Sequence, residues 1–403
     1  MSAVLFQNAR VLTMGPGPRR GPQARDLGVL DGADVLVVDG RIEAVGGKIE
    51  GSEGARRVAC DGRVLMPSFV DGHTHLCWAG ERLGEWERRL AGASYLELLE
   101  AGGGIMATVR AVRAATETEL VEGLVLRLDA ALQEGTTAIE IKSGYGLDTP
   151  NELKMLRAIA SAAKRWPGFV APTACIGHAI DPDEPNMVRR TIDETLPAVH
   201  AEFPGVTLDA YCETGAWSLE DCLTLFDRAK GLGHPCRVHA DQFNALGMIP
   251  AAIERGFVSV DHLEASTPDE LRLLAQSQTM GVMLPCSGFH VDGRYGDGRA
   301  FMDAGGALAI ATNCNPGSAP CLSMPMAMAL AVRGCGLTPA EAICAGTTNA
   351  TALLGLDDRG RIEPGARGDL VVLRFRDERE LAHSFGGRAV DLVMVDGKIV
   401  AGG

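Results

Sequence analysis

The chain has 403 residues, of which 46% are hydrophobic, 22% charged and 5% aromatic, a composition typical of a globular protein with a large core. Its net charge of −14 argues against nucleic acid or an anionic membrane as the main partner, and leaves room for a small anionic substrate. We find no apolar stretch of the roughly 20 residues that a spanning helix needs and no signal-peptide pattern. The eleven cysteines are odd in number and lack paired spacing, which predicts reduced thiols and a cytoplasmic location.

Both ends of the chain show short apolar runs separated by turn residues. The runs lie at residues 4–6, 33–38, 41–45, 368–373 and 391–400. Asp39-Gly40 and Asp396-Gly397 are typical hairpin turns within these two regions. Because chain ends often lie close together, we predict one small β-sandwich domain built from residues 1–65 and 360–403.

The middle of the chain alternates strand-like and helix-like segments. After the apolar run at 64–70, strand candidates lie at residues 136–142, 169–176, 207–213, 236–240, 257–262, 281–284 and 308–312. The clearest helix candidates lie at residues 116–134, 151–165 and 218–230. Eight strands with intervening helices over residues 66–359 predict an α/β fold, a (β/α)8 TIM-type barrel. The alternative is an open doubly wound sheet, but no glycine-rich phosphate fingerprint follows the first strand.

Histidines follow four of the eight strand candidates. His73 and His75 come directly after the first strand, and neutral imidazole is the commonest protein ligand of divalent transition metals. His178, His239 and His262 lie at or just past the ends of later strands. A single histidine near a strand end is more often a hydrogen-bonded structural residue. Four such strand ends favour a metal site, because the carboxyl ends of barrel strands converge on one rim.

Six segments spread over nearly the whole chain carry a resemblance to a known family. They are residues 69–75 (FVDGHTH), 100–105 (EAGGGI), 140–148 (EIKSGYGLD), 239–241 (HAD), 261–263 (DHL) and 315–318 (NPGS). In these segments the chain resembles the amidohydrolase superfamily and, within it, the imidazolonepropionases of histidine catabolism. The resemblance implies a barrel with a split β-sandwich, a homodimer, and hydrolysis of a ring C–N bond that turns imidazolone propionate into formiminoglutamate.

The resemblance also implies a metal site and a catalytic histidine. His73, His75 and His239 would hold one divalent metal, with zinc as the first choice and iron or manganese as alternatives. His262 would polarise the substrate carbonyl or shuttle protons.

For the substrate, the resemblance implies an arginine that binds the propionate carboxylate. Arg82 matches that arginine, since a guanidinium can bind a carboxylate in bidentate fashion. The alternative for Arg82 is a solvated surface charge that pairs with Glu81 or Glu85. The remaining substrate contacts implied are Tyr145 and His178 at the ring and its oxygen, and Asn315, Gly317 and Ser318 on the far side. Turn chemistry alone also accounts for the 315–318 segment.

Two positions depart from the family pattern. Asn313 stands where the family has an aspartate that binds metal and acts as base, and Gln242 stands where it has a glutamate. An amide cannot take a proton at neutral pH, and general-base help is typically worth about 10²–10⁴-fold. Three neutral histidines would leave the metal site near +2 rather than +1, which lowers the pKa of a bound water further. Asn313 and Gln242 then join the catalytic set as donors to a developing anion.

Because Asn313 and Gln242 replace two acids, the sequence does not decide whether the substrate ring carries oxygen or sulfur. Sulfide is a better leaving group than an amide nitrogen and asks less of an acid or base. The alternative substrate is therefore the 2-thioxo analogue, 3-(5-oxo-2-thioxoimidazolidin-4-yl)propionate, from which a desulfhydrase would release hydrogen sulfide in ergothioneine breakdown. Five cysteines lie near the predicted rim and agree with a soft substrate atom, although most buried thiols are packing residues: Cys77, Cys175, Cys212, Cys286 and Cys314.

Two further classes of protein compete with a metal-dependent hydrolase. One is a non-catalytic ligand-binding barrel, against which the histidine cluster argues because a binder needs no such cluster. The other is a cysteine-dependent hydrolase that uses Cys286 or Cys314 with His290, but nothing in the sequence fixes a Cys–His pair.

Overall fold

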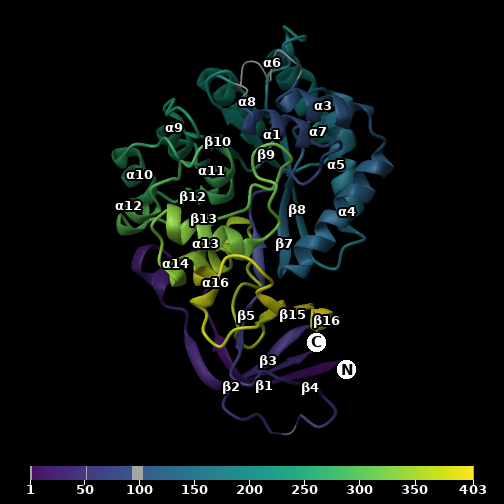
Figure 1. The fold of residues 1–403 in the computed structure, drawn as a ribbon. Coiled ribbons are helices and arrows are strands. Elements are labelled where there is room, and N and C mark those ends of the chain that lie inside the picture. The colour runs from purple at the N-terminus through teal and green to yellow at the C-terminus, as the bar shows by residue number, and fades with distance from the viewer. Residues whose placement is uncertain (1, 51, 93–102, 403) are drawn as a thin grey trace.

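Two eight-stranded sheets organise the chain in the computed structural model, which describes residues 2–50, 52–92 and 103–402 (Figure 1). One sheet is the barrel, and the other is formed by the two ends of the chain. Of the 100–105 segment named above, residues 100–102 lie outside the described residues.

The barrel sheet contains consecutive parallel strands that are neighbours in chain order. They are β6 (Phe69–Asp71), β7 (Thr136–Lys142), β8 (Phe169–Gly177), β9 (Thr207–Cys212), β10 (Arg237–Ala240), β11 (Ser259–His262), β12 (Met280–Met283) and β13 (Leu308–Ile310). The two ends of this sheet meet just past β6 and β13, where the Asn313 N–H donates to the His73 carbonyl at 3.0 Å and the His75 N–H to the Cys314 carbonyl at 3.0 Å. The predicted (β/α)8 barrel is confirmed.

Helices surround the barrel strands in Figure 1. They are α1 (Leu83–Leu90), α3 (Ile105–Ala114), α4 (Glu117–Gln133), α5 (Thr149–Ala163), α6 (Met187–Arg190), α7 (Leu196–Glu202), α8 (Leu219–Gly231), α9 (Met248–Glu254), α10 (Pro268–Ala275), α11 (Pro285–Val291), α12 (Gly298–Asp303), α13 (Met324–Gly334), α14 (Pro339–Ala345), α15 (Thr348–Leu353), α16 (Glu380–His383), the 3₁₀ helix η1 (Gly21–Arg25) and the π-helix η2 (Thr191–Thr195). Helix α4 begins after a capping box of Thr116 and Glu119, which fixes its start. Across the described part of the chain, no helix has the length and apolar character needed to cross a bilayer.

The second sheet joins the two termini. Its strands are β1 (Ala3–Leu12), β2 (Val29–Val38), β3 (Arg41–Gly46), β4 (Arg56–Ala59), β5 (Val64–Pro67), β14 (Leu370–Leu373), β15 (Val390–Val395) and β16 (Lys398–Gly402). Strand β5 pairs with β1 on one side and antiparallel with β14 on the other, so residues from both ends share one sheet. Buried Phe6, Leu65 and Met394 belong to its core. A small β domain built from both termini is confirmed, and its exact residue boundaries stay a prediction.

Candidate active site

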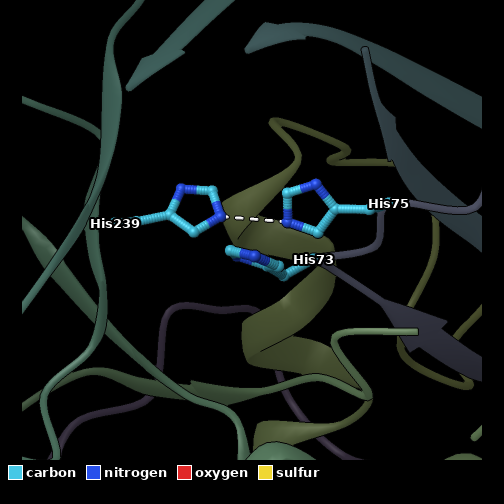
Figure 2. A group of neighbouring side chains, drawn as sticks. All are labelled: His73, His75 and His239. Atoms are coloured by element: carbon cyan, nitrogen blue, oxygen red, sulfur yellow. Dashed lines mark hydrogen bonds between the residues drawn. The ribbon is translucent and has the colours of Figure 1, made fainter. Parts of the chain in front are cut away.

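Three histidines from two barrel strands meet at the carboxyl end of the barrel (Figure 2). His73 and His75 follow β6, and His239 lies on β10. Their candidate ligand atoms all lie within 4.8 Å of one another, and all three side chains are buried. The ring centroids of His73 and His239 are 4.5 Å apart, and those of His75 and His239 are 5.1 Å apart. The three residues predicted to hold a metal therefore come together.

The ring nitrogens of this cluster fit a metal ion. His73 Nε2 and His75 Nδ1 are buried and have no hydrogen-bond partner among the described residues. The Nε2 atoms of His75 and His239 lie only 3.0 Å apart. Burial is the main cause that holds the pKa values of His73 and His75 well below that of an ordinary histidine, and the charge of Lys142 adds to it for both. The rings are therefore neutral, which is the form that binds a divalent cation.

Deeper in the barrel, charged side chains form a connected set that we call the charged floor. Its members are Glu140, Lys142, Asp209, Arg237 and Asp261, all buried. Asp209 accepts hydrogen bonds from His239 Nδ1 at 2.9 Å and from Lys142 Nζ at 2.6 Å. Asp261 lies 2.6 Å from His73 Nδ1 and accepts from Arg237 at 2.6 Å. Glu140 joins the two halves, because it accepts from Lys142 at 2.6 Å and lies 3.3 Å from Arg237.

The carboxylates of the floor fix which nitrogen of each histidine faces the cluster. Because Asp261 and Asp209 hold Nδ1 of His73 and His239, the Nε2 atoms are left for a metal, as in the carboxylate–histidine pairs of metal sites. Burial alone would raise the pKa of Asp209, but His239 and Lys142 outweigh it and hold that pKa well below its ordinary value. Burial would lower the pKa of Lys142, and Asp209 and Glu140 outweigh that effect and raise it. Both groups therefore stay charged.

Three amide side chains follow the ends of barrel strands β10 and β13, and we call Gln242, Asn313 and Asn315 the neutral rim. Asn313 Oδ1 is buried without a hydrogen-bond partner among the described residues, although the Asn313 backbone is bonded to His73. Gln242 Oε1 accepts a 2.7 Å hydrogen bond from the Tyr211 hydroxyl. Since its oxygen is held in this way, the NH₂ group of Gln242 is the part left to donate.

Asn315 uses its side chain to shape the 315–318 loop. Its Nδ2 donates to the Asn313 carbonyl at 2.7 Å and to Ser318 Oγ at 2.9 Å, while its Oδ1 accepts from the backbone N–H groups of Gly317 at 2.9 Å and Ser318 at 2.7 Å. This is the turn chemistry that the sequence offered as an alternative. Asn315 therefore supports the loop, and its side-chain contacts do not add evidence for the substrate contact predicted for it.

Arg82 lies beside that loop, directly before α1. A Cβ atom on Gly317 would come within 2.8 Å of Arg82 Nη1, so the guanidinium lies directly against this glycine and would have to shift to admit a side chain there. Arg82 pairs with Glu85 through Nε at 2.7 Å and through Nη2, and its Nη1 is 3.4 Å from Thr108 Oγ1. The alternative to a carboxylate-binding Arg82 is a solvated surface charge that pairs with Glu81 or Glu85. The pairing with Glu85 is present, but the Arg82 side chain is only 12% exposed, so Arg82 is not a solvated surface charge.

His178 and Tyr145 extend the histidine cluster. The His178 ring stacks on His75 with centroids 4.5 Å apart, and Tyr145 lies 5.3 Å from His178. Burial is the main reason that the pKa of His178 falls to about 3, and burial also raises the pKa of Tyr145. His178 Nδ1 lies 2.9 Å from the Gly144 carbonyl. Gly144 has φ +114°, and a Cβ there would lie 2.9 Å from the Cys175 carbonyl, so this loop requires glycine.

His262 ends β11 and faces the same cluster. Its ring centroid is 5.6 Å from that of His239 and 6.1 Å from that of His73. Like Asp241 and Asn313, His262 has a positive φ, which costs a residue with a side chain about 1–3 kcal/mol and is typical of functional sites. The arrangement therefore brings His262, Gln242 and Asn313 to one rim with the three candidate ligands.

The cysteines named from the sequence do not support a thiol nucleophile. Burial raises the pKa of Cys77 to about 12 and raises that of Cys314 as well, while a contact with the Cys321 thiol and burial raise that of Cys286. All three stay protonated at neutral pH, and a thiol is a poor nucleophile compared with a thiolate. Cys175, another of the cysteines near the predicted rim, lies with Asp209 and His239 in a group whose candidate ligand atoms are within 4.8 Å.

Sequence reasoning missed Tyr211, Glu264 and the functional role of the charged floor. The floor does leave a signal, because Glu140 and Lys142 are two residues apart in a buried strand and thus face the same side. Charged residues inside buried strands are rare unless they are paired, so such positions predict a buried ionic set. Which residue pairs with which depends on the register between strands, and the sequence carries no direct signal for that.

Comparisons with known proteins agree with this geometry. A family model described as the amidohydrolase family matches residues 64–400. An imidazolonepropionase from Herpetosiphon aurantiacus is 43% identical, and the match covers 98% of this chain and 96% of that protein. An imidazolonepropionase from Deinococcus radiodurans is 41% identical, covering 98% and 99%.

Solved structures share the architecture at much lower identity. A triazine hydrolase variant superposes with a TM-score of 0.77 at 16% identity, covering 99% of this chain and 95% of that one. The 5-methylcytosine deaminase from Klebsiella pneumoniae gives a TM-score of 0.76 at 16% identity, covering 99% and 97%. At this identity the likeness supports the fold alone.

Proposed function

The chain belongs to the amidohydrolase family and, within it, to the imidazolonepropionase-like proteins, and from this premise we propose that it hydrolyses the five-membered ring of imidazolone propionate to formiminoglutamate. It is a hydrolase that acts on C–N bonds of cyclic amides. The family therefore favours an enzyme over a non-catalytic ligand-binding barrel. A homodimer and a cytoplasmic location stay predictions.

The observation that carries this proposal is the link between the histidine cluster and Arg82. The backbone of Asn313 and Cys314 is hydrogen-bonded to His73 and His75, and three residues further on Gly317 packs against the Arg82 guanidinium. One short segment thus connects the candidate metal ligands to a part-buried cation. A ring with a carboxylate tail needs both features, one for the reacting carbon and one for the tail.

His73, His75 and His239 would hold the divalent metal, with Asp261 and Asp209 orienting two of them. When bound there, such a metal supplies Lewis-acid chemistry: it makes water more acidic and a carbonyl more electrophilic. The protein supplies the rest. Arg82 binds the propionate, Tyr145 and His178 form an apolar and aromatic wall for the ring, and the NH₂ of Gln242 donates to negative charge that develops on it. His262 moves the proton.

A second candidate substrate is the 2-thioxo analogue, for which the neutral rim is the specific observation. Asn313 and Gln242 can donate hydrogen bonds to a developing anion, but neither can take a proton. Replacing the ring sulfur by oxygen consumes one water and releases hydrogen sulfide. Since sulfide is an easier leaving group than an amide nitrogen, this reaction needs less acid–base help from the rim.

One pair of assays separates the two candidates. Purified protein loaded with zinc, iron or manganese is incubated with each propionate in turn, and formiminoglutamate and sulfide are measured. Formiminoglutamate at an ordinary rate of about 1–10³ s⁻¹ supports imidazolone propionate and rules out the shift to sulfur. Sulfide release with little formiminoglutamate supports the thioxo substrate. No turnover of either compound by protein with bound metal would refute both.

A further inference from the structure

His262 touches a carboxylate that the proposed function does not use. Its Nδ1 lies 3.2 Å and 3.1 Å from the two side-chain oxygens of Glu264. Both side chains are buried, with 3% of His262 and 6% of Glu264 exposed. Because Nδ1 is held by Glu264, Nε2 is the nitrogen that the pair leaves available to the site.

A strained turn brings the two side chains together. His262 has φ +95° and Leu263 has φ +73°, a conformation that residues with side chains rarely adopt. Hydrogen bonds to the end of β10 hold it: Leu263 N–H donates to the Ala240 carbonyl at 3.3 Å and Ala265 N–H to the Asp241 carbonyl at 2.7 Å. The turn is thus anchored on the strand that carries His239.

The other carboxylates near the site are engaged elsewhere. Asp209 and Asp261 bind the candidate ligands His239 and His73, and Asp241 accepts from Ser266 at 2.8 Å. Among the described residues, Glu264 is the carboxylate bonded to a site histidine that is not a candidate ligand.

We propose that Glu264 is a positioning residue that makes His262 the proton acceptor of the reaction, in place of the carboxylates absent at Asn313 and Gln242. This inference rests on the proposed function. As the oxygen of the attacking water bonds to the ring carbon, its proton passes to His262 Nε2. Glu264 keeps Nδ1 protonated and stabilises the imidazolium that forms, by the logic of histidine–carboxylate pairs in general-base catalysis. When the ring C–N bond breaks, Nε2 returns that proton to the leaving nitrogen.

Steady-state kinetics of Glu264→Gln and Glu264→Asp test the proposal. The glutamine variant keeps the shape and loses the charge, so kcat falls about 10²-fold while KM stays within about threefold. The aspartate variant keeps the charge and retains at least tenfold more kcat than the glutamine variant. Metal content and melting temperature match those of the wild type, and Asp269→Asn, an exposed carboxylate paired with Arg272, serves as the control without effect.

Coupling between the two residues separates a positioning role from a general structural one. In a His262→Ala background, Glu264→Gln changes kcat by no more than about twofold, because the residue through which it acts is gone. A glutamine variant with kcat within about threefold of the wild type, or effects that multiply in the double variant, would overturn the proposal.

A nuclear magnetic resonance measurement needs neither substrate nor metal. In a ¹H–¹⁵N correlation spectrum of the metal-free protein, wild-type His262 carries its proton on Nδ1, and this preference weakens in Glu264→Gln. A wild-type His262 without a proton on Nδ1 overturns the proposal even if the variants fail to fold. Failure of the proposed function looks different: the wild type then turns over neither propionate.

Discussion

The charged floor and the neutral rim lie at the same end of the barrel, and the floor is the deeper of the two. The floor consists of charged side chains, whereas the rim consists of neutral amides. The floor has three carboxylates and two cations, all buried, which leaves a net charge of −1. The rim has amides, which can donate hydrogen bonds but cannot take a proton at neutral pH. The negative charge next to the candidate ligands therefore comes from the floor carboxylates that contact His73 and His239. Asn313 and Gln242 add no negative charge on the substrate side.

This difference changes the charge count made from the sequence. From the sequence, three neutral histidines and no ligand carboxylate predict a metal site with a charge near +2. In the floor, carboxylates bind Nδ1 of two of those histidines, on the side away from the cluster. Part of the negative charge that compensates a bound metal therefore lies behind the ligands and not among them. The ligands alone are therefore an incomplete basis for predicting the acidity of a bound water.

The largest effect is expected from breaking the floor with Lys142→Met. The substitution leaves Glu140 and Asp209 without their shared cation, and an uncompensated buried charge costs about 3–5 kcal/mol. We expect the free energy of unfolding of the metal-free protein to fall by about this amount in urea titrations. Lys230→Met, on the exposed side of α8, is the matched control and changes it by less than about 0.5 kcal/mol.

The same variant has a pH dependence of defined sign. In the wild type the folded-state pKa of Lys142 is raised and that of Asp209 is lowered. Their contribution to stability is therefore complete between about pH 4 and pH 10, and is lost as the pH falls through the folded pKa of Asp209 or rises through that of Lys142. In Lys142→Met, Asp209 loses one of the two groups that lower its pKa and takes up a proton more readily, so the destabilisation is largest near pH 8 and shrinks towards pH 5. A loss that grew towards pH 5 would contradict the pairing.

The rim can be altered without touching the floor by the double variant Asn313→Asp and Gln242→Glu. It restores two groups that can take a proton, and it adds negative charge beside the ligands. We expect the ratio of kcat/KM for imidazolone propionate to that for the thioxo analogue to rise about 10²-fold.

The control for this variant makes the same amide-to-acid changes at the exposed positions Asn186 and Gln276. It leaves the ratio unchanged. An unchanged ratio in the rim variant itself would mean that the amides do not set the choice of substrate.

The rim could be predicted from the sequence and the floor could not, for a physical reason. Rim residues follow strand ends, and the ends of apolar runs are visible in a sequence: the predicted strand at 136–142 coincides with β7, and the predicted helix at 116–134 exceeds α4 by one residue at each end. Parallel strands of a barrel place those ends on one face. The meeting of His73, His75 and His239 follows from that rule alone.

The contacts of the floor depend on register between strands. Lys142 and Asp209 are separated by 67 positions in the chain, and a shift of one residue in either strand would turn one side chain to the opposite face. Glu264 was missed for another reason. It lies past the end of β11, and no sequence pattern predicts the positive φ values at His262 and Leu263 with which the chain places its carboxylate against His262 Nδ1.

The smallest effect is expected from Arg82, which lies beside the 315–318 loop. Arg82→Lys keeps the positive charge but loses the planar guanidinium, which is held by Glu85 on one side and lies against Gly317 on the other. If Arg82 anchors the propionate equally in the ground and transition states, KM rises about tenfold and kcat changes by less than about twofold. Arg88→Lys, on the exposed face of α1, leaves both constants unchanged. A fall in kcat with KM unchanged would instead place Arg82 beside the reacting atoms. Binding of the propionate by Arg82 would then not be separate from the chemistry at the neutral rim.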